Sequence, residues 1–299
     1  MSGPFGSSQW MYKPDAGIPW GGARGVFGGG TNVIDYITIQ STGDAQDFGD
    51  MTLARGSIGG GASDGSRGVF PGGYSGGYLA SIDYITIAST GDAQDFGDLN
   101  KGITQCFTGT NGVRGLTWGG SIVGGDTNEI NYITIASTGD SSDFGDCSST
   151  KWQIAPVNDA TRACCAGGHN GTTQINVIEY VTVASTGDAT DFGDVSAAHR
   201  AGAGASDATR GVFFGGYPSN LRIIEYITLQ STGNTTDFGD IAQDSFAESG
   251  CCDGIRGVYA GGRSAPTNQI QYITMQSTGD STDFGDLTVG RQAGAVAGN

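Results

Sequence analysis

The sequence is poor in charge, especially positive charge, and in long apolar runs. Charged residues make up 15% of its 299 residues, with 14 Lys and Arg against 30 Asp and Glu. A net charge of −16 repels phosphate backbones and anionic lipid, so nucleic acid and membranes are poor partners. No apolar run approaches the roughly 20 residues of a membrane-spanning helix. Residues 1–13 also lack the basic and apolar regions of a secretory signal.

Signatures of catalysis and cofactor binding are missing as well. The two histidines, His169 and His199, lie about 30 residues apart without a partner pattern, and we expect both in exposed loops. No phosphate-binding loop or dinucleotide fingerprint is present. Every repeated aspartate has equivalents elsewhere in the chain, so no carboxylate pair is singled out for hydrolysis. We therefore expect no catalytic residue, no enzyme and no cofactor.

The six cysteines do not recur at regular positions. They are Cys106, Cys147, Cys164, Cys165, Cys251 and Cys252. The adjacent pairs lack the two-residue gap of a CxxC metal knuckle. Cys147 stands where other copies of the repeat place Leu99 or Val195, which indicates a small core residue. We expect reduced structural thiols, in keeping with assembly in a reducing cytosol, with disulfides or a metal site as alternatives.

Glycine, by contrast, is abundant at 55 residues, and it belongs to an internal repeat. Three markers recur six times at spacings of 46–48 residues, apart from one arginine interval of 43. The first is Ser-Thr-Gly, at Ser41, Ser89, Ser137, Ser185, Ser231 and Ser277. The second is an arginine before an apolar run and a double glycine, at Arg24, Arg67, Arg114, Arg162, Arg210 and Arg256. The third is a tyrosine in a β-rich run, at Tyr36, Tyr84, Tyr132, Tyr180, Tyr226 and Tyr272.

Each repeat predicts four short strands, which we call A to D. In the fifth copy they are residues 202–206, 210–215, 223–229 and 238–241, separated by Gly, Asp, Asn or Ser. No 3.6-residue apolar period is present, so helices should be almost absent. Four strands repeated six times predict an all-β, six-bladed β-propeller with four antiparallel strands per blade. A β-helix is the alternative, but its coils are shorter than this repeat.

The phase of the repeat predicts how the ring closes. The first copy begins with strand B at Arg24, whereas residues 291–298 match a strand A without its strand B. Pairing these two segments would close the ring and remove exposed sheet edges. Residues 1–23 then form a non-repeat segment and residues 24–299 the propeller. Strand A should lie nearest the axis, where only small residues fit.

The connections divide into an invariant and a variable set, which antiparallel strands place on opposite sides of the disc. The A–B and C–D connections are nearly identical in every copy and carry most of the aspartates, which predicts one strongly acidic face. The B–C and D–A connections vary and carry aromatic and basic residues, so we expect recognition there. The candidate binding residues are Tyr74, Tyr78, Lys151, Trp152, His169, Arg200, Tyr217, Arg222 and Arg263.

The repeated Asp-x-x-Asp-Phe-Gly-Asp segment has two interpretations. Asp44, Asp47 and Asp50 supply the oxygen ligands that calcium prefers, but their spacing does not match an EF-hand loop. We favour turn capping by the aspartates, together with a salt bridge from one of them to the repeat arginine. The structural set is then the six repeat arginines with Asp50, Asp98, Asp146, Asp194, Asp240 and Asp286.

The apolar run, double glycine and downstream tyrosine resemble the kelch repeat over residues 24–299, although the Trp usual on the third kelch strand is missing. The unit Arg-Gly-Val-Phe-Gly-Gly … Ile-Asp-Tyr-Ile-Thr-Ile-Ala-Ser-Thr-Gly-Asp-Ala-x-Asp-Phe-Gly-Asp-Leu also resembles virion proteins of tailed phages, especially marine and cyanobacterial ones. The opening Ser7-Ser8-Gln9-Trp10-Met11-Tyr12 is similar to the start of some of them. This resemblance implies a tail-fibre, attachment or capsid-decorating protein, assembled in the host cytoplasm and located in the virion.

The non-repeat segment is unusually apolar for a free tail. Its large side chains are Phe5, Trp10, Met11, Tyr12 and Trp20. They either pack on the propeller rim or anchor it to other virion proteins. The variable face would then contact a host surface glycan or protein. A free carbohydrate-binding lectin is the alternative function, and a propeller glycosidase or lactonase is a third.

Overall fold

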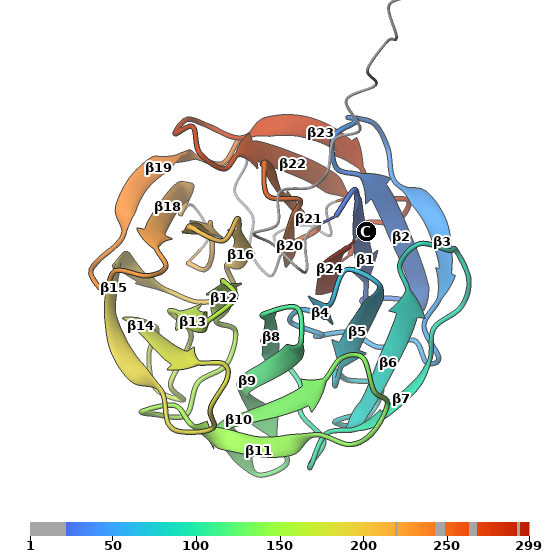
Figure 1. Ribbon diagram of the computed structural model, residues 1–299, viewed down its shortest axis with the longest axis horizontal. Helices are drawn as coiled ribbons and strands as arrows, with labels where there is room; N and C mark the ends of the chain where they lie inside the picture. Colours follow the sequence, from blue (N-terminus) through green and yellow to red (C-terminus); the bar gives the residue numbers. More distant parts are fainter. Residues whose placement is uncertain (1–21, 219–220, 243–248, 263–267, 292–293, 299) are drawn as a thin grey trace, which may run out of the picture.

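Six four-stranded antiparallel sheets are arranged radially around a central axis (Figure 1). This computed structural model describes residues 22–218, 221–242, 249–262, 268–291 and 294–298. Within these ranges every regular element is a β-strand, as the short β-rich runs between glycines lead one to expect. The prediction of a six-bladed β-propeller with four strands per blade is confirmed.

In each blade the strands follow one another outward from the axis. We number the blades 1 to 6 in the chain order of their second strands. The innermost strands, for blades 2 to 6 and then blade 1, are β4 (Ala62–Ser63), β8 (Phe107–Thr110), β12 (Ala155–Asn158), β16 (Ala203–Ser206), β20 (Ser249–Cys252) and β24 (Gly294–Gly298). The second strands are β1 (Arg24–Gly28), β5 (Arg67–Pro71), β9 (Arg114–Ile122), β13 (Arg162–Ala166), β17 (Arg210–Phe214) and β21 (Arg256–Ala260). The third strands are β2 (Val33–Thr38), β6 (Ser81–Thr86), β10 (Gly125–Thr134), β14 (Ile175–Thr182), β18 (Ile223–Thr228) and β22 (Gln269–Thr274). The outermost strands are β3 (Gln46–Asp50), β7 (Gln94–Asp98), β11 (Ser142–Asp146), β15 (Thr190–His199), β19 (Thr236–Asp240) and β23 (Thr282–Asp286).

The two ends of the propeller share one blade. Strand β24 pairs antiparallel with β1, with Arg24 opposite Gly298 and Gly28 opposite Gly294. Blade 1 therefore takes its innermost strand from the end of the chain and its other three from the start. The predicted ring closure is confirmed, and it leaves blade 1 with the same four strands as the others.

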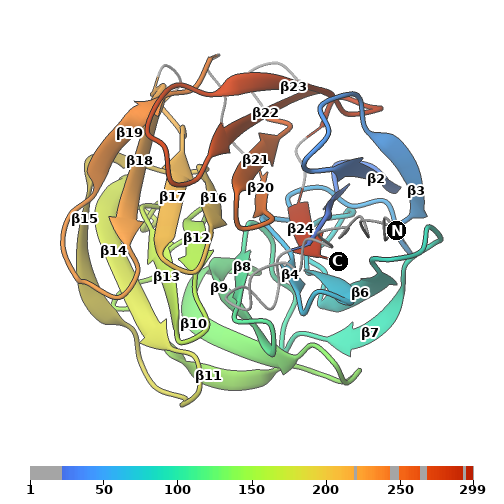
Figure 2. The ribbon, with the colours of Figure 1, turned by 45° about the horizontal axis from the view of Figure 1, so that its top comes forward.

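The innermost strands meet around the axis (Figure 2), where backbones approach too closely for side chains. A Cβ atom on Gly204 would lie 2.0 Å from the carbonyl oxygen of Pro156, and one on Gly250 would lie 2.3 Å from that of Gly204. Only glycine fits at these two positions. A narrow cavity of about 70 Å³ remains, lined mainly by small residues of these strands and the segments before them.

The core lies between the blades. Five of the six second strands are buried along four of their five positions, because blades cover both of their faces. One cluster joins Val26 and Phe48 of blade 1 to Phe70 and Ile85 of blade 2. Burying large apolar side chains across each junction is the main force holding neighbouring blades together.

The six repeat arginines also join neighbouring blades. Arg24 Nη1 donates a hydrogen bond of 2.9 Å to the carbonyl oxygen of Ile87 in blade 2. Its guanidinium lies 4.7 Å from the ring centre of Tyr36 in its own blade. All six arginines repeat both contacts, and Arg256 closes the circle by donating to Ile39 of blade 1.

The predicted salt bridge between a repeat arginine and an aspartate is therefore wrong. Among the described residues the ion pairs involve other basic groups. A carbonyl oxygen and a tyrosine ring already hold the guanidinium. This arrangement needs no buried carboxylate, which would be costly to desolvate.

The first aspartate of the motif caps a strand of the preceding blade. The Asp92 carboxylate accepts a 3.0 Å hydrogen bond from the amide of Asp50. The same bond recurs at every junction, and Asn234 replaces the aspartate once. The predicted capping of a local turn is therefore wrong for this aspartate, because its bond crosses to the neighbouring blade. Asp44, Asp47 and Asp50 are not among the described side chains that converge on a possible metal position.

The acidic residues are placed differently from the prediction. The second and third aspartates, such as Asp47 and Asp50, lie inside the outermost strand, which starts two residues earlier than expected. Figure 1 shows these outermost strands along the perimeter of the disc. The negative charge is therefore divided: the first aspartate of each copy stays in the C–D connection, and the second and third extend the charge along the rim.

The third strand carries a buried acid in several blades. A basic residue of the D–A connection before that blade pairs with it. Asp83 pairs with Arg55 at 2.7 Å, and both side chains are at most 1% exposed. Asp35 pairs with Arg291 in the same way, and Glu179 with Lys151. In blade 3 both positions are neutral, with Asn131 and Ile103 in place of the pair. The charge of the buried acid is thus matched in blades 1, 2 and 4.

This matching predicts how a single and a double substitution differ. Arg55→Ile should destabilise the fold by about 3–5 kcal/mol, because it leaves Asp83 charged and buried. Adding Asp83→Asn recreates the neutral pair of blade 3 and should recover most of that loss. Denaturant unfolding of both variants measures the difference. If the double variant is no more stable than the single one, charge matching is not the reason for the pair.

Candidate binding site

Two kinds of connection meet on one side of the disc, which we call the loop side. In blades 2 to 5 the residue after the double glycine forms an antiparallel bridge with the preceding D–A connection. The pairs are Gly56–Tyr74, Thr104–Ser121, Trp152–His169 and Arg200–Tyr217. On the opposite side, glutamines after the third strand bond to A–B turns of the preceding blade, as Gln230 does to Asp159. The predicted division of the connections between two sides is confirmed.

Two of these bridges carry the largest side chains. Trp152 and His169 exchange backbone hydrogen bonds of 3.1 and 3.0 Å at the start of blade 4. Arg200 and Tyr217 exchange bonds of 3.1 and 2.7 Å in blade 5. Residues directly opposite each other in an antiparallel bridge bring their side chains together, so each bridge yields one packed pair.

The two pairs join into one stack, which we call the aromatic stack. The Trp152 and His169 ring centres are 4.9 Å apart with planes inclined by 38°. The Arg200 guanidinium carbon lies 4.6 Å from the Trp152 ring centre and 4.8 Å from that of Tyr217. Arg200 Nη1 also donates to Gln153 Oε1 at 3.0 Å. The order is therefore His169, Trp152, Arg200, Tyr217, and the arginine is held between two rings.

The histidine of the stack is held neutral. Burial and the nearby Arg200 charge lower the pKa of His169, although Asp126 acts in the opposite direction. The amide of Gly171 donates to His169 Nδ1 at 3.0 Å, so the neutral ring carries its proton on Nε2. The imidazole thus stacks as an uncharged ring that keeps one N–H donor at Nε2.

All four members of the aromatic stack are half-buried. Their rings and the guanidinium are fixed by the scaffold yet remain in contact with solvent. Asp126 lies beside the segment that follows His169, since a Cβ on Gly171 would be 3.4 Å from the Oδ2 atom of Asp126. Flat apolar faces next to hydrogen-bonding groups suit a ligand with both apolar patches and hydroxyl or amide groups.

Other candidate residues lie apart from the stack. Tyr74 and Tyr78 form an edge-to-face pair in blade 2, with ring centres 5.8 Å apart, and are 47% and 37% exposed. Arg222 is exposed and donates to the carbonyl of Ala242. Arg263 and the proposed anchor residues Phe5, Trp10, Met11, Tyr12 and Trp20 lie outside the described residues.

Two expectations about loop residues are wrong. Lys151 was expected to face a partner, but it is 1% exposed and pairs with Glu179. His199 was expected in an exposed loop, but it is 2% exposed, and its Nδ1 lies 3.0 Å from the carbonyl oxygen of Ala197. Both occupy the repeat position of Arg55, where the connection turns inward. Comparison of the copies at that position is the sequence signal that identifies them as core residues.

The burial of His199 predicts a pH-dependent stability. Burial lowers its pKa, against the opposing effects of the Ala197 carbonyl and Glu225. The unfolded chain takes up a proton near pH 6.5 and the folded chain only at lower pH, so stability falls as pH drops through about 6.5. The melting temperature should therefore fall between pH 7.5 and 5.5, and His199→Gln should reduce that fall. His169→Gln is the matched control and should change it less, since His169 is more exposed. An equal fall in melting temperature with pH in His199→Gln and in the unmodified chain would contradict this account.

The fold and the stack define a class of protein, a β-propeller with one asymmetric surface on a repeated scaffold. No protein-family model matches the chain, and no curated protein is significantly similar to it. Within the described ranges, no helix has the length and apolar character needed to cross a membrane.

Proposed function

We propose that this propeller is a non-enzymatic recognition protein of a virion, and that its aromatic stack binds a surface glycan. The observation that carries the recognition part is the convergence of Trp152, His169, Arg200 and Tyr217 into one half-buried stack. Sugar rings offer flat C–H faces that pack on aromatic rings, and hydroxyls that bond to polar neighbours. Asp126 supplies such a neighbour next to the rings.

The asymmetry of the loop side supports this proposal. The same bridge positions carry Gly56 and Tyr74 before blade 2, and Thr104 and Ser121 before blade 3. Neither pair forms a stack of this kind. The core contacts repeat six times, whereas this stack occurs over blades 4 and 5. It lies in connections on a rigid scaffold, which is where binding residues are commonly found.

The virion setting rests on the resemblance of the repeat to virion proteins of tailed phages. The long, nearly identical repeat and the apolar segment at residues 1–23 are the features that support it. In this proposal the segment attaches the propeller to other virion proteins, and the loop side points outward to the host surface. An acidic rim disfavours contact with the packaged nucleic acid.

Loss of one ring tests the binding surface. Trp152→Ala should weaken binding to a glycan identified on an array of bacterial surface polysaccharides by about tenfold or more, because it removes the central ring of the stack. Tyr74→Ala is the matched control, since Tyr74 occupies a bridge position in blade 2 outside the stack. Titration calorimetry with the glycan gives both affinities. Equal affinities for Trp152→Ala and the unmodified chain, or no glycan bound at all, would exclude the stack as a glycan site.

Removal of residues 1–20 tests the virion setting separately. The shortened chain should keep the melting temperature of the propeller but fail to enter phage particles, measured by electron microscopy and mass spectrometry of purified particles. Normal incorporation would remove the role of the segment as an anchor. Glycan binding by a full chain that is never found in particles would instead identify a free lectin.

A further inference from the structure

The junction between blades 3 and 4 differs from the other five in its chemistry. Cys147 follows strand β11 at a position that other copies fill with Met51, Leu99, Val195, Ile241 and Leu287. Cys165 lies in strand β13 at a position that other copies fill with Phe27, Phe70, Thr117, Phe213 and Tyr259. Cysteine occurs at both positions only here, so two thiols replace two core side chains at the same junction.

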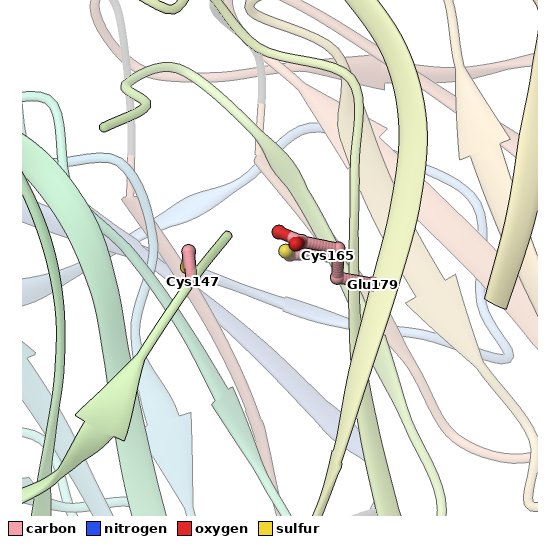
Figure 3. Close-up of side chains that lie close together, drawn as sticks. All are labelled: Cys147, Cys165 and Glu179. Carbon is pink, nitrogen blue, oxygen red and sulfur yellow. The ribbon is translucent and has the colours of Figure 1, made fainter. Parts of the chain in front are cut away.

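The two thiols meet a buried carboxylate. Cys165 lies directly opposite Glu179 on strand β14. The sulfur atoms of Cys147 and Cys165 and a carboxylate oxygen of Glu179 all lie within 4.8 Å of one another. Figure 3 shows Cys147 approaching from a separate chain segment, while Cys165 and Glu179 lie side by side. All three side chains are buried.

Lys151 completes the cluster. Its ammonium group pairs with Glu179, and the Ser148 amide donates to the same carboxylate at 3.0 Å. Burial alone would raise the pKa of Cys165, but a hydrogen bond from Cys147 and the Lys151 charge lower it. The hydrogen bond to Cys165 and burial raise the pKa of Cys147.

We propose that Cys147, Cys165 and Glu179 bind one zinc-class divalent metal ion. Thiolates with one carboxylate are a ligand set that Zn²⁺ accepts. Zinc–sulfur bonds of about 2.3 Å in tetrahedral geometry place the ligand atoms roughly 3.8 Å apart, so the present positions need only a small contraction. Three protein ligands leave one position of a four-coordinate ion for water or for the second oxygen of Glu179.

The charges of the cluster favour this exchange. With both thiols protonated, Glu179 and Lys151 cancel each other. A divalent ion that displaces the two thiol protons converts both sulfurs to thiolates and leaves the total again at zero. The buried region therefore gains a metal without gaining net charge, which removes the main cost of placing an ion in the core. Lys151 then acts on the ligands through Glu179, as a positioning residue.

Cobalt provides a direct probe, because Co²⁺ occupies zinc sites and its bonds to thiolate absorb in the near ultraviolet. The full chain should be expressed in medium supplemented with CoCl₂, so that the ion is present while the buried site forms. We expect one cobalt per chain and a thiolate-to-cobalt absorption band. Cys147→Val and Cys165→Thr, which use residue types found at these positions in other blades, should each lose the band and most of the bound metal.

Cys164→Val is the matched control. Cys164 is buried next to Cys165 on the same strand, and other copies carry valine at its position, so this variant should keep both cobalt and the band. No thiolate-to-cobalt band in the unmodified chain would overturn the proposal, whether or not the variants fold. An equal loss in Cys164→Val and Cys147→Val would also overturn it. A Cys147–Cys165 disulfide in metal-free protein purified under reductant would do the same. The readout is independent of glycan binding, so this result and that of the aromatic stack are separable.

Discussion

The contact between one blade and the next is the constraint on which this structure depends, because the ring closes only if all six junctions have nearly the same geometry. Arg24, stacked on Tyr36 and bonded to the carbonyl of Ile87, shows the solution used six times. The guanidinium uses a neutral acceptor and a ring face, so the junction contains no buried acid at this point. The aspartate cap on the neighbouring strand adds a second polar contact nearer the rim. Large apolar side chains fill the space between these two contacts.

A scaffold closed in this way leaves the loop side free to diverge. The bridge between the D–A connection and the residue after the double glycine keeps the same backbone geometry before blades 2 to 5. Its side chains change from Gly56 and Tyr74 to Trp152 and His169 without disturbing the strands. The aromatic stack arises because two such bridges lie next to each other and one contributes an arginine that fits between rings. Recognition is thus built from positions that the ring does not need.

Divergence also reaches the core, and in several blades it does so in matched sets. Arg55 with Asp83, Lys151 with Glu179, and Ile103 with Asn131 are three ways to fill the same two positions without leaving a buried charge unpaired. The Cys147 and Cys165 pair follows the same principle, since two neighbouring apolar positions changed together. The cysteine pair lies between blades 3 and 4, and the aromatic stack lies over blades 4 and 5.

The sequence by itself determined the architecture, because the repeat period, the strand-forming runs and the unpaired final strand near residue 294 leave one way to close the ring. It also indicated Trp152, His169, Arg200 and Tyr217 as candidates, since aromatic and basic residues in variable connections stand out against six copies. It did not show that these four stack, nor that Lys151 and His199 turn into the core. Those facts depend on contacts between residues far apart in the chain, and a connection of given composition is free to turn either way until its neighbours are in place. The partner of the repeat arginine was decided in the same manner: a carbonyl in the next blade becomes available only when the blades stand side by side.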